Sequence, residues 1–281
     1  MCELLAMSSR FPARLTQSLT ALASHAQGSS RNRDGWGIAY YKGGTVVLHR
    51  GIDPADTSER VRCLETDGPA TSLSIAYIRH ATKGPIGLQN TGPYVRVLAG
   101  RQHVFVHNGN LVDLDASDDF PDASDSNIEF TPLGDTDSEL AFCLLLHRIK
   151  SLSRGTTSPV PLNKRLACVT EFATSLRKLG PSSFLYSDGE ALFAHADRRL
   201  QPLTGKVTAP ALYRLSCAAA DSPALLLDCQ LPAKTKEATL TLLASVPLSD
   251  EAWVPMSRGE VIAVQCGEIS AISHIQSTEG A

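Results

Sequence analysis

Apolar residues recur along this chain at two spacings, and each spacing predicts a different secondary structure. Apolar side chains every three or four residues, the spacing of one helix face, predict helices over 138–150 and 163–179. Leu15, Leu19 and Leu22 have the same spacing after Pro12, which suits a first helical turn, so a helix is expected there too. Short apolar segments bounded by turn residues predict strands at 2–8, 35–41, 45–50, 72–80, 102–107, 183–187, 191–196, 211–217, 239–246 and 260–265.

The order of these elements predicts an α+β fold. Strands flanked by helices, with a central helix pair and hairpin-like joins, favour mostly antiparallel sheets packed against helices. Segment 151–161 is rich in Ser, Thr and Pro but lies between the two central helices, so we interpret it as a loop. A single domain over residues 1–281 is therefore expected. Segment 113–135 is dense in Asp, Ser and Pro and predicts a long acidic surface loop, which we interpret as a solvated insertion rather than a flap over a pocket.

Composition excludes several classes of protein. The net charge of -3 gives no electrostatic footprint for nucleic acid. No apolar run approaches the roughly 20 residues of a membrane span, and no signal-peptide pattern opens the chain. The seven cysteines are scattered without a C-x-x-C pair, which argues against a disulfide framework or a zinc site. No phosphate-binding G-x-x-x-x-G-K-[ST] loop is present. We expect a soluble, reduced, cytoplasmic protein without a metal or cofactor.

Cys2 is the first residue that suggests chemistry. It follows the initiator Met1, and removal of that methionine would expose a residue that carries a nucleophile and a base together. The thiol would attack, while the free α-amine, with a reference pKa near 7.7–8.0, would take and return a proton. Taken alone, a second-position cysteine is better explained as a small residue in an amino-terminal strand.

Four further segments change that interpretation. They are Asp34-Gly35-Trp36-Gly37, Arg79-His80-Ala81-Thr82, His107-Asn108-Gly109 and Asp135-Thr136-Asp137-Ser138-Glu139. Enzymes that hydrolyse an amino acid's side-chain amide need a nucleophile, oxyanion donors, a cation for the substrate carboxylate and an anion for its ammonium. Arg79 with Thr82 suits the carboxylate, and Asp137 suits the ammonium. The Asn108 amide and the Gly109 N–H suit an oxyanion hole.

Each of these residues also has a purely structural explanation. Arg79 could pair with a surface acid, and Asn108-Gly109 is a hairpin signal in its own right. Asp137 could cap the helix that follows it. His107 is more simply explained as holding a loop than as a base, because the α-amine already fills that role. Their joint occurrence is what favours a catalytic site.

Together these segments resemble the class II glutamine amidotransferases, which are amino-terminal-nucleophile hydrolases. The opening residues and the length are most similar to the stand-alone YafJ-type group, and the similarity extends to residues 245–248 and 259–260. The resemblance implies a four-layer αββα sandwich of two antiparallel sheets. It also implies the following site: Cys2 as nucleophile after loss of Met1, Asn108 and Gly109 as oxyanion hole, and Arg79, Thr82, His107 and Asp137 as substrate-binding residues. One departure is Gly92, at a position where the family often has His.

The resemblance implies hydrolysis of a γ-glutamyl amide through a γ-glutamyl thioester, with release of ammonia. The partner would be glutamine or another γ-glutamyl amide, and a separate synthase subunit could accept the ammonia. The alternatives are hydrolysis of a γ-glutamyl amide other than glutamine, a catalytically silent γ-glutamyl-binding subunit, and another amino-terminal-Cys hydrolase with an apolar acyl pocket. The sequence leaves the acceptor and the formation of a homo-oligomer open.

Overall fold

The computed structural model describes residues 1–28, 30–120, 129–153, 159–202, 204–218 and 238–275. Within them the helices are α1 (Gln17–Ser24), α2 (Glu59–Asp67), α3 (Asp137–Leu152) and α4 (Leu162–Leu179). The strands are β1 (Glu3–Ala13), β2 (Trp36–Lys42), β3 (Thr45–Gly51), β4 (Thr71–Ile78), β5 (Tyr94–Leu98), β6 (Arg101–Gly109), β7 (Ser182–Ser187), β8 (Leu192–Ala196), β9 (Arg199–Leu200), β10 (Val207–Thr208), β11 (Tyr213–Ala218), β12 (Thr239–Ala244), β13 (Val254–Pro255), β14 (Glu260–Gln265) and β15 (Glu268–His274).

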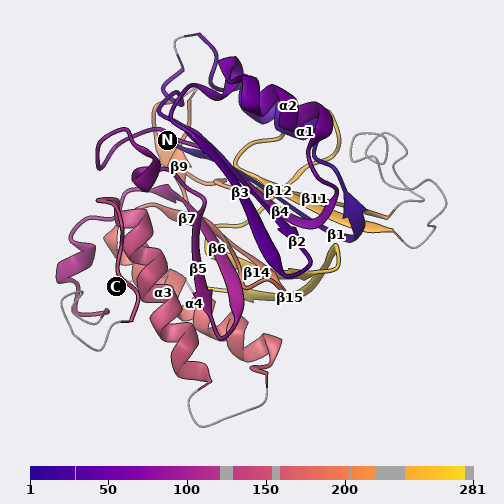
Figure 1. Cartoon of the computed structure of the whole chain (residues 1–281). Helices are drawn as coiled ribbons and strands as arrows, with labels where there is room; N and C mark the ends of the chain where they lie inside the picture. Colours follow the sequence, from indigo (N-terminus) through magenta and orange to yellow (C-terminus); the bar gives the residue numbers. More distant parts are fainter. Residues whose placement is uncertain (29, 121–128, 154–158, 203, 219–237, 276–281) are drawn as a thin grey trace.

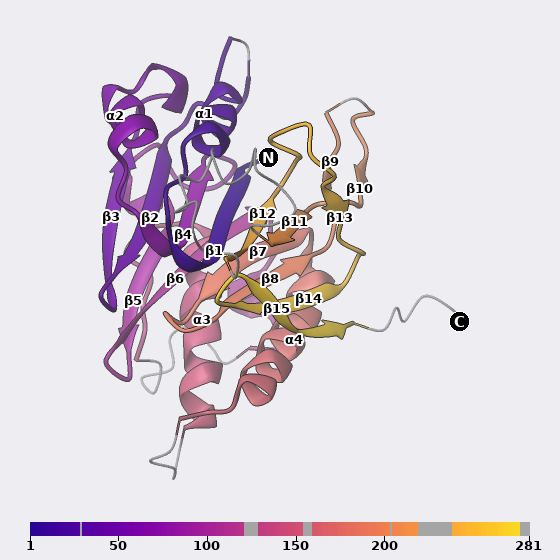
Figure 2. The ribbon, with the colours of Figure 1, turned by 90° about the vertical axis from the view of Figure 1, so that its right-hand side faces the viewer.

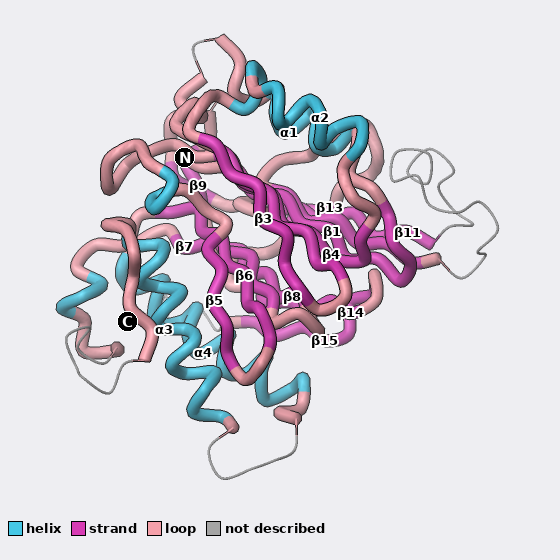
Figure 3. The backbone as a smooth tube through the Cα atoms, in the orientation of Figure 1, coloured by secondary structure: helices cyan, strands magenta, loops and turns pink. Residues whose placement is uncertain are grey.

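Two large antiparallel sheets form the centre of the molecule (Figures 1 and 3). The described strands of the first sheet run in the order β13-β11-β12-β1-β4-β2-β3, and those of the second in the order β15-β14-β8-β7-β6-β5. Strand β1 therefore lies inside its sheet, between β12 and β4. This position places the residues that precede β1 beside the end of β4.

Helices cover the outer face of each sheet, which gives four layers (Figure 2). One apolar cluster joins α1 and α2 to the first sheet, through residues such as Leu22 and Ile38. A second fills the space between the sheets, where Leu4 and Val106 pack. A third joins α3 and α4 to the second sheet, through residues such as Phe105. The expected αββα sandwich is confirmed.

Strand alternation decides which side chains face the space between the sheets. On β1, Leu4 and Ala6 belong to the cluster between the sheets, whereas Leu5 and Met7 face α1 and α2. Cys2 continues the inward series and is packed against the inner cluster. On β6 the inward residues are Val104 and Val106, and the same alternation directs Asn108 inward.

Three details differ from the sequence-based expectations. Pro12 lies within β1 rather than opening a helix, and α1 begins only at Gln17. Strands β5, β9, β10, β13 and β15 and helix α2 were not predicted. The segment 113–135 is not wholly solvated, because Leu114, Phe120 and Phe130 are buried against α3 and α4; residues 121–128 lie outside the described residues.

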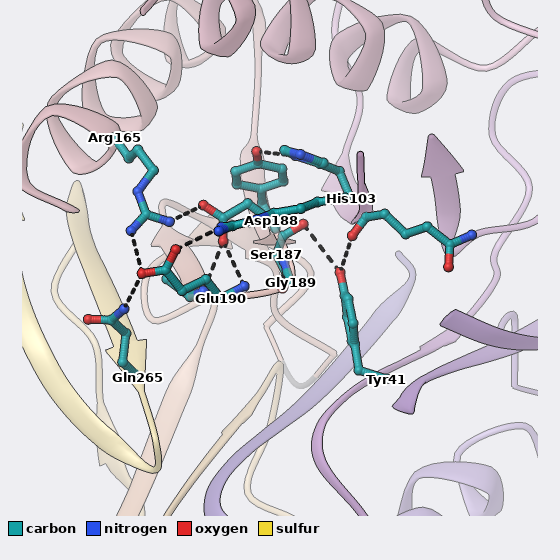
Figure 4. Close-up of polar contacts among 12 residues, drawn as sticks. Tyr41, His103, Arg165, Ser187, Asp188, Gly189, Glu190 and Gln265 are labelled. Atoms are coloured by element: carbon teal, nitrogen blue, oxygen red, sulfur yellow. Dashed lines mark hydrogen bonds and ion pairs between the residues drawn. The ribbon is translucent and has the colours of Figure 1, made fainter. Parts of the chain in front are cut away.

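A polar cluster, with Arg165 and Asp188 buried and Glu190 exposed, connects α4 to the turn between β7 and β8 (Figure 4). Arg165 pairs with Asp188 and, at 3.2 Å, with Glu190. The second Asp188 oxygen accepts hydrogen bonds from the main-chain N–H groups of Glu190 and Ala191, at 3.0 and 2.9 Å. The Tyr41 hydroxyl donates across to the Ser187 carbonyl at 3.5 Å, so the cluster also links the two sheets.

Among the described residues, no helix is long and apolar enough to cross a bilayer.

Candidate active site

Cys2 lies just before β1, and its sulfur contacts the end of β4. The Sγ atom is 3.0 Å from the Tyr77 hydroxyl and accepts a hydrogen bond from the His80 N–H at 3.3 Å. Burial raises the pKa of the Cys2 thiol, although the Tyr77 and His80 hydrogen bonds act in the opposite direction. The thiol is therefore protonated at neutral pH, and it needs a base before it can act as a nucleophile.

Arg79 follows β4 directly and points to the same side as Tyr77. It is only 2% exposed, yet none of the described residues offers it a carboxylate. Its guanidinium donates instead to three main-chain carbonyls, those of Lys83, Gly84 and Pro85, at 3.2–3.3 Å. A buried cation without an anionic partner is costly, so this guanidinium is suited to bind an external carboxylate. Arg79 is close enough to Cys2 to act on the pKa of its thiol, after the larger effects of burial and hydrogen bonding.

Asn90 ties the loop around Arg79 to the segment that precedes α3. Its side-chain oxygen accepts from the Asp135 N–H at 2.7 Å. Its Nδ2 donates to the Pro85 carbonyl at 3.1 Å and to the Asp135 carboxylate at 3.3 Å. Thr82 lies exposed on the same loop. The position of the Arg79 loop is therefore fixed relative to the start of α3.

Asn108 is a buried amide without a partner. Its side chain is 0% exposed, and neither Oδ1 nor Nδ2 has a hydrogen-bond partner among the described residues. Such a group costs roughly 1–3 kcal/mol of stability. Buried side-chain polar groups are nearly always paired, so an unpaired one points to a functional requirement.

Gly109 follows Asn108 at the end of β6 and has no room for a side chain. A Cβ there would lie 1.8 Å from the Pro181 carbonyl oxygen and 2.6 Å from His107 Nε2. Only glycine therefore permits this approach between the end of β6 and the start of β7. The Asn108 amide and the Gly109 N–H belong to consecutive residues, and their role as an oxyanion hole stays a prediction.

Asp137 is the first residue of α3 and is 5% exposed. One carboxylate oxygen accepts from the Leu111 N–H at 2.7 Å, and the other accepts from the Ser138 N–H at 2.8 Å. Thr136 caps the helix through its hydroxyl, which accepts from the Glu139 N–H at 3.2 Å. Asp137 is thus not the cap, and its orientation is fixed by the two main-chain bonds.

His107 lies on the other face of β6 from Asn108. Its Nδ1 shares a 2.9 Å hydrogen bond with the Ser138 hydroxyl of α3. Burial lowers the pKa of His107, against the opposing effect of Asp137, so the imidazole is neutral. The structure thus places His107 where it can hold α3 against β6, rather than beside Cys2.

Two sets of contacts connect segments that carry predicted residues: one joins Cys2 to β4, Gly92 and β6, and the other joins β5 to the start of α3. Tyr77 contacts Cys2 on one side, and its ring faces Gly92, where a Cβ would be 3.5 Å from the ring and 3.6 Å from Val106. The second set begins at Tyr94 on β5, whose hydroxyl is 2.8 Å from the hydroxyl of Thr136, the residue before Asp137. Sequence reasoning missed Tyr77, although strand alternation places it on the same side as Arg79.

A cavity of about 870 Å³ surrounds the amino terminus, which lies beside β9 (Figure 1). We call it the amino-terminal cavity; its lining includes Met1, Glu3, His25, Arg31, Asn32, Arg199 and Gln201. The Met1 sulfur accepts a hydrogen bond from the Leu200 N–H at 2.8 Å. Glu3 pairs with His25 and, at 3.3 Å, with Arg199. Burial lowers the pKa of the Met1 α-amine, and Arg199 and Arg31 add smaller effects in the same direction.

Comparison with known proteins gives a consistent result. The family model for class-II glutamine amidotransferases matches residues 1–280. The Escherichia coli K12 protein named "Putative glutamine amidotransferase YafJ" is 31% identical over 267 residues, which cover 92% of this chain and 96% of that protein. A Haemophilus influenzae protein with the name "Putative glutamine amidotransferase" is 29% identical, over 95% of this chain and 85% of its own length.

Solved structures agree with this result. The crystal structure described as a "predicted glutamine amidotransferase" from Pseudomonas aeruginosa has a TM-score of 0.64 and 29% identity, and the match covers 96% of this chain and all of that one. The glutamine phosphoribosylpyrophosphate amidotransferase of Bacillus subtilis shares the fold at 15% identity and a TM-score of 0.56, with 97% of this chain matching 49% of that enzyme. The chain belongs to the class II glutamine amidotransferases.

Proposed function

We propose that the protein hydrolyses a γ-glutamyl amide, with glutamine as the simplest case, and that Cys2 is the nucleophile once Met1 has been removed. The free α-amine of Cys2 then accepts the thiol proton. Arg79, with Thr82 on its loop, binds the substrate α-carboxylate, and Asp137 binds the α-ammonium. His107 supports this arrangement from the opposite face of β6.

In the proposed reaction, the Cys2 thiolate is the attacking group. Sγ attacks the amide carbon, and the resulting oxyanion accepts hydrogen bonds from Asn108 Nδ2 and the Gly109 N–H. The C–N bond breaks as the α-ammonium returns its proton to the departing nitrogen. A γ-glutamyl thioester remains, and water cleaves it to glutamate and regenerates the thiol.

The observation that carries the proposal is Arg79. This guanidinium is 2% exposed, lies near the Cys2 sulfur and, within the described part of the chain, is bonded to carbonyls alone, so it is suited to receive an anion. The α-carboxylate of a glutamyl substrate supplies that anion. This pairing also favours a γ-glutamyl substrate over the acyl chain of an amino-terminal-Cys hydrolase with an apolar pocket.

The test is intact-mass analysis after incubation with 6-diazo-5-oxo-L-norleucine, a glutamine-shaped electrophile. We expect a chain without Met1 that gains one adduct, located on Cys2. Cys2→Ala should lose the adduct, whereas Cys63→Ala, which removes an exposed free cysteine, should keep it. An adduct that persists in Cys2→Ala would refute the assignment. Retained Met1 without an adduct would favour a silent γ-glutamyl-binding subunit.

The fate of the ammonia needs a separate measurement. Turnover of glutamine by the purified chain alone would show that water suffices as the acceptor of the γ-glutamyl group. If ammonia formation becomes appreciable only when a second protein is added, a synthase subunit that accepts the ammonia is the better account.

A further inference from the structure

The amino-terminal cavity has a size and a charge that the release of ammonia does not require. We propose that it binds the amine half of the substrate and selects γ-glutamyl amides whose amine component carries a carboxylate, as in a γ-glutamyl amino acid. This inference rests on the proposed function, because it concerns the leaving group of the same reaction.

The position of the cavity follows from the chemistry of the α-amine. The Cys2 nitrogen must return a proton to the departing nitrogen, so the two atoms must come within about 2.6–3.2 Å. Met1 is bonded to that same Cys2 nitrogen, and its side chain extends to the Leu200 N–H within the cavity. Loss of Met1 therefore leaves an open volume next to the place where the leaving nitrogen must lie. With Met1 still part of its lining, the cavity measures about 870 Å³, which is within the range of small-molecule sites.

The charges of the cavity favour an anion. Arg199 is 3% exposed; its Nη1 donates to the Ser245 carbonyl at 2.8 Å, and its Nη2 pairs with Glu3 at 3.3 Å. Its Nε is buried and has no partner among the described residues. Glu3 is shared between Arg199 and His25, and exposed Arg31 adds a further cation to the lining. A single carboxylate is thus shared between two basic groups in a site that also contains Arg31.

A carboxylate on the leaving amine would complete this set of charges. In a γ-glutamyl amino acid, that carboxylate is separated from the scissile nitrogen by one carbon atom. The step is the one proposed above: the bond between Sγ and the glutamyl carbonyl carbon Cδ forms, the Cδ–N bond breaks, and the nitrogen leaves as a free amino acid with the proton from the α-ammonium. Water then releases glutamate. Both halves of the substrate would bind arginines, Arg79 on the glutamyl side and Arg31 with Arg199 on the amine side.

The test compares γ-glutamyl-glycine with γ-glutamyl-glycinamide, which have the same size and differ only in carboxylate against carboxamide. For the purified full-length protein without Met1, we expect kcat/KM to be at least about tenfold higher for the carboxylate, because charge-assisted hydrogen bonds are the stronger ones. Arg31→Gln should lower this ratio at least about threefold, and Arg31→Lys should largely restore it. Arg62→Gln, which removes an exposed arginine on α2, should leave the ratio unchanged.

Equal kcat/KM values for the two amides would overturn the inference, and so would a ratio that Arg31→Gln does not change. In either case, hydrolysis of the neutral amide would leave the proposed function intact. Absence of turnover with glutamine and with both dipeptide analogues, together with no labelling of Cys2, would overturn the inference and the proposed function together.

Discussion

Replacement of Asn108 by Leu, which has nearly the same shape, should change activity and stability in opposite directions. The Asn108 amide is 0% exposed and unpaired on both polar atoms among the described residues, so its removal should raise the free energy of unfolding by about 1–3 kcal/mol. For a chain of this size, each 1 kcal/mol corresponds to a rise of roughly 2–4 °C in Tm. The same change removes an oxyanion donor and should lower kcat by about 10²–10³-fold.

Asn90 is the matched control. It is also 0% exposed, but its amide is bonded to Asp135 and Pro85. Asn90→Leu should therefore destabilise the protein, because it leaves the Asp135 N–H unpaired and removes one of the two hydrogen bonds to the Pro85 carbonyl. Thermal unfolding and a glutaminase assay on both variants measure the two quantities. If Asn108→Leu is destabilised as much as Asn90→Leu, or keeps full activity, the assignment of Asn108 as an oxyanion donor fails.

Three further changes test other parts of the site and the fold. Tyr77→Phe removes the 3.0 Å hydrogen bond to the Cys2 sulfur, so the pKa of the thiol should rise and alkylation of Cys2 at pH 7.5 should slow about fivefold, for a bond of about 1 kcal/mol. Gly109→Ala places a methyl group 1.8 Å from the Pro181 oxygen and should cost about 1–3 kcal/mol of stability and at least about 10²-fold in kcat. Burial lowers the pKa of His195 to about 4. The neutral imidazole therefore contributes fully to stability above 6.5, the pKa of the group in the unfolded chain, and this contribution is lost as pH falls towards 4. Between pH 7 and pH 5 the wild type should lose about 2 kcal/mol more than His195→Gln, as measured by urea unfolding.

These predictions have their own controls. Gly92→Ala should be tolerated, since the nearest atoms to its Cβ are at ordinary contact distances of 3.5 Å or more. Should Gly92→Ala and Gly109→Ala be equally damaging, the steric argument at Gly109 is wrong. A rate of Cys2 alkylation that Tyr77→Phe leaves unchanged would exclude the phenol as a partner of the thiol. Parallel pH profiles for His195→Gln and the wild type would show that this imidazole does not titrate as described.

Most of the fold could be predicted from the sequence because the apolar spacing is regular. The helices expected at 138–150 and 163–179 differ by at most two residues at each end from α3 and α4. The expectation after Pro12 failed because tertiary pairing extends β1 to Ala13, against the local helix signal. Helix α2 was missed because it is largely polar and buries only Val61 and Leu64.

The candidate site was predictable where chemistry and strand position coincide, and not where it depends on the fold. Cys2, Arg79 and Asn108 are polar residues next to apolar strands, and this makes them visible in the sequence. Tyr77 looked like one more apolar strand residue, and only the pairing of β1 with β4 places its hydroxyl on the sulfur. The contact of Glu3 with Arg199 joins residues 196 positions apart in the chain, and local patterning contains no signal for such a contact.

The position of Met1 makes the newly synthesised chain a latent form of the proposed enzyme. While Met1 is attached, the Cys2 nitrogen is an amide that cannot act as a base, and the methionine side chain lines the cavity assigned to the leaving group. Met1 and Cys2 are half-buried at the start of β1, which pairs with β12 and β4. Removal of the methionine therefore competes with folding of the chain. Chains that fold first would remain as a stable, inactive population, distinguishable by mass from the mature enzyme.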